Sequence, residues 1–391
     1  MTIQYPLATT SWDSLEYEAM QKVISSGMFT MGEHVKIYEK DFANYLGSKY
    51  AVMVSSGSTA NLIMVASLFY KKNNPLKRGD EVIVPAVSWS TTYFPLQQYG
   101  LKLKFVDIDL ETLNFDLKAL ESAITPKTRM IMAVNLLGNS NDYQTIKKLI
   151  DGKNITLIED NCESLGATLQ GKQCGTFGAM GTFSSFFSHH ISTMEGGIVC
   201  TDDEELYHIL LCLRAHGWTR NLPKHNHVSG VKSDDAFEES FKFILPGYNV
   251  RPLELSGAIG IEQLKKLPTF VSERRKNAAR FTELFHKHPS LMIQKEIGES
   301  SWFGFSFVIK PHSGLTRKDL VKRLTDNGIE CRPIVAGNFA KNEALKWMDY
   351  EIHDKLKNAD WIDENGLFIG NHHVDMSQGL KFVHKTLEGL K

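Results

Sequence analysis

Residues 50–70 read YAVMVSSGSTANLIMVASLFY, and this stretch predicts the unit from which the fold is built. Tyr50–Val54 is apolar and rich in valine, as in a buried strand, whereas Thr59–Tyr70 is an apolar run typical of a helix. Ser56-Gly57-Ser58 lies between them. Backbone N–H groups and hydroxyls at the start of a helix can hold a phosphate group. A plain serine N-cap explains the same residues equally well.

The same alternation of strand-like and helix-like runs continues to residue 201. Further strand-like runs are expected at 81–84, 101–106, 129–134, 155–159, 181–187 and 197–201, and the acidic residues 202–205 open a predicted helix that ends near Arg214. Strands that alternate with helices through short connections predict a mostly parallel α/β sheet. Ligands of such sheets bind beyond the carboxyl ends of the strands, so polar residues at those ends are candidate site residues.

The rest of the chain predicts a second, smaller domain. The run 257–267 looks helical and is expected to stop at Pro268, leading out of the first domain. Residues 270–391 mix helices with strands such as Phe303–Ile309. We therefore expect a large α/β domain over residues 1–265 and a smaller C-terminal α+β domain over residues 266–391. The polar stretch 221–240 predicts a long surface loop that serves as an active-site flap or a dimer arm.

Composition and charge narrow the class of protein. The 391 residues are 42% hydrophobic and 23% charged, which excludes a disordered chain. A net charge of −1 argues against a general nucleic-acid binder. Apolar stretches such as 60–70 are too short to cross a bilayer, and the stretch 1–6 lacks the features of a signal peptide. We therefore expect a cytoplasmic enzyme that has neither nucleic acid nor membrane as a partner.

The cysteines and histidines predict no metal centre. The five cysteines are odd in number, include no CxxC pair and stand at least a dozen positions apart, which argues against disulfides and against an iron–sulfur cluster. They are Cys162, Cys174, Cys200, Cys212 and Cys331. The histidines outside the stretch 184–197 are scattered without a spacing that suits zinc.

Three further features stand at or near the ends of predicted strands. Asp160 follows the apolar strand 155–158, where its carboxylate can pair with a protonated heterocycle nitrogen or cap a helix. Trp89 follows Val84-Pro85 and can either stack on an aromatic ring or pack in the core. His189 and His190 stand in a small, polar stretch before Gly196-Gly197, a context that core packing explains poorly.

Together, these features resemble the DegT/DnrJ/EryC1/StrS family of sugar aminotransferases, which have the PLP fold type I. The family pattern is an SGT-like turn, an aromatic residue after a proline, ED-x-A, S-F-x-x-x-K-x-x-x-x-x-E-G-G and Y-N-x-R. The corresponding residues here are Ser56-Gly57-Ser58, Trp89, the stretch 159–163, Ser184 to Gly197, and Tyr248-Asn249-Val250-Arg251. The resemblance covers nearly the whole chain, and all five motifs occur in order.

One position departs from the family pattern in a way that changes the expected reaction. The Schiff-base lysine of the family lies five residues after the serine and six before Glu-Gly-Gly. Counting from Ser184 and counting back from Glu195 both lead to His189, and no lysine occurs between Lys172 and Lys224. An imidazole cannot form a Schiff base with PLP, but it can move protons near neutral pH. His189 is the expected catalytic residue, with His190 as the competing candidate.

The resemblance also implies which residues bind the cofactor, PLP or its amine form PMP. Asp160 is expected on the pyridine nitrogen and Trp89 stacked on the ring. Glu163, where many relatives have Gln or His, is expected near the 3′-hydroxyl. The phosphate is expected to bind Gly57, Ser58 and Ser184 of one subunit and Asn249 of the other. The implied assembly is a homodimer with shared active sites.

A histidine at this position implies dehydration rather than transamination. The resemblance of the surrounding sequence further implies the reaction: it replaces the C3 hydroxyl of GDP-4-keto-6-deoxy-D-mannose by hydrogen, releases ammonia and uses L-glutamate to regenerate PMP, in GDP-colitose and O-antigen biosynthesis. Such an enzyme is a lyase. The expected substrate-binding residues are Gly27, Met28, Phe29, Thr30, His216, Arg220, Arg251 and Glu330. His216 and Arg251 are expected to meet glutamate, and the others the nucleotide sugar. A surface charge is the plain alternative for Arg220 and Glu330.

Two other functions are compatible with the missing lysine. A CDP-sugar 3-dehydrase also lacks it, but requires an iron–sulfur cluster and therefore grouped cysteines. A catalytically inactive binding module is the second alternative. The intact phosphate-binding turn, Trp89, Asp160 and Glu163 argue against such a loss of function.

Overall fold

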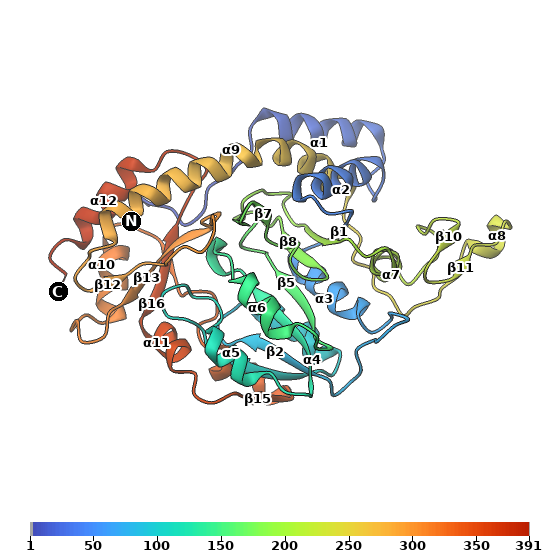
Figure 1. Cartoon of the computed structure of the whole chain (residues 1–391). Helices are drawn as coiled ribbons and strands as arrows, with labels where there is room; N and C mark the ends of the chain where they lie inside the picture. Colours follow the sequence, from blue (N-terminus) through green and yellow to red (C-terminus); the bar gives the residue numbers. More distant parts are fainter. Residues whose placement is uncertain (1–2, 391) are drawn as a thin grey trace.

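The computed structural model describes residues 3–390, and its centre is an eight-stranded sheet (Figure 1). The strand order is β1-β9-β8-β5-β4-β2-β3-β15. The strands are β1 (Tyr50–Val54), β2 (Glu81–Pro85), β3 (Lys102–Val106), β4 (Thr128–Val134), β5 (Thr156–Asp160), β8 (Gly181–Ser184), β9 (Gly197–Thr201) and β15 (Tyr350–Ile352). Only β9 runs against its neighbours, so the prediction of a mostly parallel sheet is confirmed.

Helices cover both faces of this sheet. Successive strand residues point to opposite sides, and the apolar side chains on each side are buried under helices. Even-numbered residues such as Val82 and Val84 pack with α3 (Gly57–Ser67), α4 (Ser90–Gln98) and α7 (Glu204–Arg214). Ile83 and Ile131 face the other side, with α5 (Leu117–Ala123) and α6 (Tyr143–Ile150). On that same side Met53 and Ile198 pack with α2 (Glu33–Leu46) and α9 (Glu254–Phe285). Helix α1 (Ser14–Ser26) lies along α9.

The C-terminal part contains a second sheet and a second core. The sheet has the order β12-β13-β16-β14, with β12 (Leu291–Met292), β13 (Gly304–Ile309), β14 (Cys331–Arg332) and β16 (Gly366–Gly370). Helices α10 (Arg317–Asp326), α11 (Lys357–Asn365) and α12 (Ser377–Leu387) accompany it. Other short elements of the chain are β6 (Thr168–Leu169), β7 (Lys172–Gln173) and the 3₁₀ turns Leu136–Gly138, Phe339–Lys341 and Glu343–Trp347. Tyr5, near the N-terminus, is buried in this second core.

Helix α9 does not stop where the sequence indicated. It continues through Pro268 to Phe285. A proline inside a helix removes one backbone hydrogen bond, but Leu267, Phe270 and Val271 beside it are buried, and this packing offsets the loss. The predicted division between residues 265 and 266 falls inside α9, while β15 returns to the large sheet. The division into residues 1–265 and 266–391 stays a prediction.

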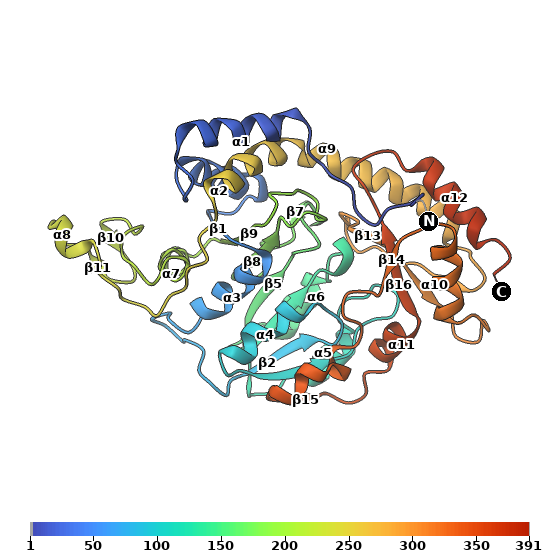
Figure 2. The same cartoon turned by 180° about the vertical axis from the view of Figure 1, so that it is seen from behind.

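The stretch 221–240 is more ordered than a plain loop. It forms a short hairpin of β10 (His225–Asn226) and β11 (Gly230–Val231), followed by the single turn α8 (Ala236–Glu239). The two opposite views both show it projecting away from the large sheet (Figure 2). Over residues 3–390, no helix combines the length and apolar character that a membrane crossing requires.

Candidate active site

A cavity of about 620 Å³ opens at the carboxyl ends of the parallel strands. It brings together residues that follow β1, β2, β5 and β8. Seven predicted site residues line it, namely Gly57, Ser58, Trp89, Asp160, Glu163, Ser184 and His189. These seven residues therefore lie together at the strand ends, as the strand-end rule predicts, and their roles stay predictions.

The turn between β1 and α3 forms one wall of the cavity. Ser56 is the N-cap of α3, and its side-chain oxygen accepts a hydrogen bond from the Thr59 amide at 3.2 Å. The first amides of a helix have no partner within it and favour negative charge. A Cβ at Gly57 would lie 2.6 Å from the Ser184 Cβ, so only glycine fits there. Ser56 is thus an N-cap, as the plain interpretation predicted. It binds the Thr59 amide, so the amides of Gly57 and Ser58 at the start of α3 stay available for a phosphate group.

Asp160 presents a buried carboxylate at the end of β5. Its Oδ2 accepts hydrogen bonds from Asn61 Nδ2 and Thr92 Oγ1, each at 2.8 Å, and its Oδ1 accepts one from the Cys162 amide at 3.1 Å. No helix follows it, so it is not a helix N-cap. Three donors on two oxygens hold the carboxylate in one orientation in the wall of the cavity.

His189 has a defined tautomer. Its Nδ1 lies 2.6 Å from the Cys162 carbonyl oxygen, which can only accept, so Nδ1 carries the proton in the neutral ring. Burial lowers the pKa of the imidazole to about 4, although the Cys162 carbonyl and the Asp160 carboxylate act in the opposite direction. The ring is therefore neutral at pH 7, and its Nε2 has a free lone pair. Phe303 packs edge-on against it, with ring centroids 5.1 Å apart.

His190, the competing candidate, lies outside the cavity. His190 is buried, and its Nε2 lies 3.1 Å from the Ser301 carbonyl oxygen. It does not line the cavity. Of the two adjacent histidines, only His189 can reach a bound molecule there.

Glu163 lines the cavity close to Asp160. Its Oε2 accepts a hydrogen bond from the Leu137 amide at 2.9 Å. Burial raises the pKa of its carboxyl to about 7, and the Leu137 amide opposes that shift. Near neutral pH this group therefore exists in both the protonated and the ionised form.

Most of the other predicted site residues lie around a different cavity of the single chain. A second cavity of about 730 Å³ shares no lining residue with the first and contains Thr30, Arg220, Asn249 and Arg251. His216 is next to it, since its neighbour Ala215 lines the cavity. Gly27, Met28 and Phe29 lead from the end of α1 to Thr30, with the side chains of Met28 and Phe29 exposed. Within one chain, the predicted residues of the second cavity therefore lie apart from the predicted cofactor-binding residues and His189.

Glu330 lies beside the first cavity without lining it. Its Oε2 accepts a hydrogen bond from the Leu7 amide at 2.8 Å, and Leu7 does line the cavity. Sequence reasoning missed Arg332, Phe303 and Leu7 among the lining residues. Arg332 was discoverable, because it stands two residues after Glu330. Leu7 and Phe303 carry no such signal, since apolar residues are most often core.

Comparison with known proteins agrees with the family resemblance of the sequence motifs. The model of the DegT/DnrJ/EryC1/StrS aminotransferase family matches residues 11–384. The GDP-4-keto-6-deoxy-D-mannose 3-dehydratase of Yersinia pseudotuberculosis is 66% identical over 387 residues, 99% of this chain and 98% of that protein. Two crystal structures of such a dehydratase superpose with a TM-score of 0.98 at 64% identity, covering 98% of this chain and all of theirs. One contains GDP-perosamine, and the other a trapped PLP-glutamate geminal diamine.

Proposed function

Because the chain belongs to the DegT/DnrJ/EryC1/StrS aminotransferase family, we propose that it is a PLP-dependent 3-dehydratase of a GDP-linked sugar. It removes the C3 hydroxyl of GDP-4-keto-6-deoxy-D-mannose and yields GDP-4-keto-3,6-dideoxy-D-mannose and ammonia, while L-glutamate regenerates PMP. The enzyme is a lyase that serves GDP-colitose and O-antigen biosynthesis. The observation that carries the proposal is His189, which lines the cavity at the position of the family's lysine and whose Nδ1, rather than Nε2, is bonded to the protein.

The first cavity suits PLP and PMP. The amides at the start of α3 and the hydroxyls of Ser58 and Ser184 match a phosphate, and the absence of a side chain at Gly57 leaves room for it. Asp160 matches a protonated pyridine nitrogen, and Trp89 offers an aromatic face. When bound, the cofactor supplies the amine that meets the sugar ketone and a ring that accepts electrons.

His189 supplies the proton chemistry. At neutral pH its Nε2 accepts a proton, and the Nδ1 bond to the Cys162 carbonyl stabilises the resulting cation. The protonated ring can then donate to the departing C3 oxygen. A lysine would return a proton to the sugar and complete a transamination. No lysine lines the cavity formed by the described residues, so elimination is the expected outcome.

We further propose a homodimer in which each active site joins both cavities. The predicted phosphate and glutamate ligands Asn249, Arg251 and His216 lie apart from His189 in one chain, and a partner subunit would bring them to it. Large apolar side chains are exposed near both cavities, as at interfaces. They are Trp89, Phe186 and Phe187 near the first and Met28, Phe29 and Leu253 near the second. The cytoplasm is the proposed location, since all five cysteines are free, as expected in a reducing compartment.

Mass spectrometry of the products tests this function directly. The purified protein is incubated with PLP, L-glutamate and GDP-4-keto-6-deoxymannose. We expect a nucleotide sugar that is one oxygen atom lighter after its C3 hydroxyl is replaced by hydrogen, together with ammonia and 2-oxoglutarate. A 4-amino sugar would instead show transamination and contradict the proposal. Conversion of glutamate without change of the sugar would reject the nucleotide sugar but retain the cofactor chemistry.

Substitution Gly57→Ala is expected to weaken PLP binding by at least about tenfold, equivalent to roughly 1.4 kcal/mol. The added methyl group would lie 2.6 Å from the Ser184 Cβ and would displace the wall that holds the phosphate. Titration of PLP by absorbance measures the effect. Gly152→Ala is the control for a strained backbone elsewhere in the chain, because its Cβ would meet nothing within 4 Å but its φ of +68° disfavours alanine. Equal affinities of Gly57→Ala and the parent would remove the turn from the proposed phosphate site.

Substitution Glu163→Gln is expected to stabilise the PLP-free protein at pH 8 and to leave it unchanged below pH 4.5. The folded protein keeps the Glu163 proton up to about pH 7, whereas the unfolded chain loses it near the ordinary pKa of 4.5. The stability of the parent therefore falls as pH rises from 4.5 to 7, by about 1–3 kcal/mol. Denaturant unfolding of both proteins over pH 4.5–8 tests this, and parallel curves would contradict it.

A further inference from the structure

The backbone of Ser192, three residues after His189, is bound on both sides by side chains from distant parts of the chain. Its amide donates to Gln263 Oε1 at 2.9 Å, and its carbonyl accepts from Trp12 Nε1 at 3.0 Å. Gln263 lies on α9, and Trp12 precedes α1. The segment that follows His189 is thus tied to two elements outside the active-site loop.

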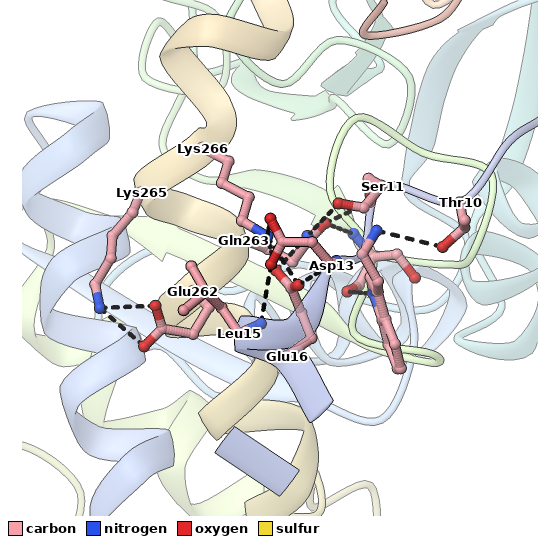
Figure 3. A network of polar contacts seen from close by, with 11 residues as sticks. Thr10, Ser11, Asp13, Leu15, Glu16, Glu262, Gln263, Lys265 and Lys266 are labelled. Carbon is pink, nitrogen blue, oxygen red and sulfur yellow. Dashed lines mark hydrogen bonds and ion pairs between the residues drawn. The ribbon is translucent and has the colours of Figure 1, made fainter. Parts of the chain in front are cut away.

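The orientation of the Gln263 side chain is determined by its neighbours (Figure 3). Its Nε2 donates to the Ser11 carbonyl at 3.1 Å and to Glu16 Oε1 at 2.8 Å, both of which can only accept. Its Oε1 accepts from the Ser11 hydroxyl at 2.6 Å as well as from Ser192. A flipped amide would place donor against donor at Ser192. The oxygen of Gln263 is therefore held toward the loop.

A buried ion pair supports this orientation. The Glu16 side chain is fully buried, and both of its oxygens accept from Lys266 Nζ, at 2.7 and 2.8 Å. The Asp13 amide donates to Glu16 Oε2 at 2.8 Å. The charges of Glu16, Lys266 and Asp13 are thus paired with one another beside Gln263. This network joins the first turn of α1 to α9 around Gln263, the residue that binds the Ser192 amide.

His189 lies in the loop 185–193, between a half with exposed side chains and a half that is buried and hydrogen-bonded. Phe186 and Phe187 before it are exposed, whereas Ile191 and Thr193 after it are buried. The Thr193 amide donates to the Ser185 carbonyl at 2.9 Å and closes the loop. A lysine bonded to its cofactor is placed by that bond. A histidine base has no such bond, so its surroundings must place the ring to within a fraction of an ångström.

We propose that Gln263 and Trp12 are positioning residues that hold the loop 185–193 so that His189 points into the cavity. This proposal rests on the proposed role of His189 as the base. Neither residue lines the cavity, and both act through the backbone of Ser192.

The test compares Gln263→Met and Trp12→Phe with Lys265→Met. Lys265 pairs with Glu262 on the surface of the same helix, at 2.8 Å, and its Nζ makes no hydrogen bond to residues 185–193 within the described part of the chain, so it serves as the control. We expect kcat to fall roughly 10- to 100-fold in Gln263→Met and roughly 3- to 10-fold in Trp12→Phe, with KM nearly unchanged. Hydrogen exchange of residues 186–193, followed by mass spectrometry, is expected to become faster in both variants. Lys265→Met is expected to match the parent.

Each outcome decides the proposal. Unchanged exchange in residues 186–193 would show that the two side chains do not hold the loop. Faster exchange with unchanged kcat would show that they are structural and do not position His189. Should Gln263→Met fail to fold, Trp12→Phe decides, because it removes one hydrogen bond and keeps an aromatic ring. A parent protein without dehydratase activity would overturn the proposed function and, with it, the positioning of a base, whereas the exchange data would still report whether the loop is held.

Discussion

Dehydratase activity is expected to fall by at least about 10³-fold when His189 is replaced by lysine. The variant loses the Nε2 that accepts and returns the proton, a contribution of about 10²–10⁴-fold in general acid–base catalysis. It also gains an amine at the position from which the family binds PLP covalently. Borohydride treatment followed by mass spectrometry should therefore detect PLP attached to position 189 of the variant and none attached to the parent.

The variant His189→Asn separates these two effects. An asparagine can keep a hydrogen bond to the Cys162 carbonyl but cannot take a proton, so activity should be lost without covalent attachment of PLP. If either variant dehydrates the sugar at the parental rate, His189 is not the base. His189→Lys could instead be inactive because it binds no PLP. In that case the dialysed variant will show no absorbance from PLP.

The second large effect is expected from Asp160→Asn. The substitution keeps the shape of the side chain but removes the negative charge that pairs with a protonated ring nitrogen. Without that pairing the cofactor accepts electrons poorly, and we expect kcat to fall by about 10²–10³-fold, similar to the loss of other preorganised electrostatic groups. PLP affinity should also decrease, as measured by absorbance titration.

The control for Asp160→Asn is Thr92→Val. Thr92 donates to Asp160 Oδ2 at 2.8 Å, and Asn61 donates to the same oxygen, so the carboxylate keeps its charge and one of these two donors when Thr92 is replaced. A loss of about tenfold or less is expected there, corresponding to one hydrogen bond. Equal losses in the two variants would show that orientation, and not charge, is the contribution of Asp160.

The parts of the fold that local sequence patterns specify were predicted well. The strands around 50–54 and 155–159 and the turn at Gly57 follow from apolar runs and from short polar stretches after them. His189 was found by counting from Ser184 and from Glu195, a local measure that requires no coordinates. Candidate residues at the ends of parallel strands meet because all these strands run in one direction.

Other features escaped prediction because they depend on packing between distant segments. Pro268 ends a helix by local rules, yet buried neighbours carry α9 through it. The pairing of β15 with β3 joins residues about 250 positions apart, and no local pattern signals it. Leu7 and Phe303 line the cavity for the same reason, since each is brought there by a segment far from the motifs.

The sequence by itself determined the kind of sheet, the family resemblance and the replacement of a lysine by His189, because each depends on residue types at short, countable spacings. Only the tertiary structure decided which ring nitrogen of His189 carries the proton, that Glu163 titrates near neutral pH, and that Gln263 and Trp12 hold the loop. A tautomer, a pKa and the position of a loop depend on which donors, acceptors and low-dielectric surroundings come within a few ångströms. Those neighbours come from parts of the chain that no spacing relates.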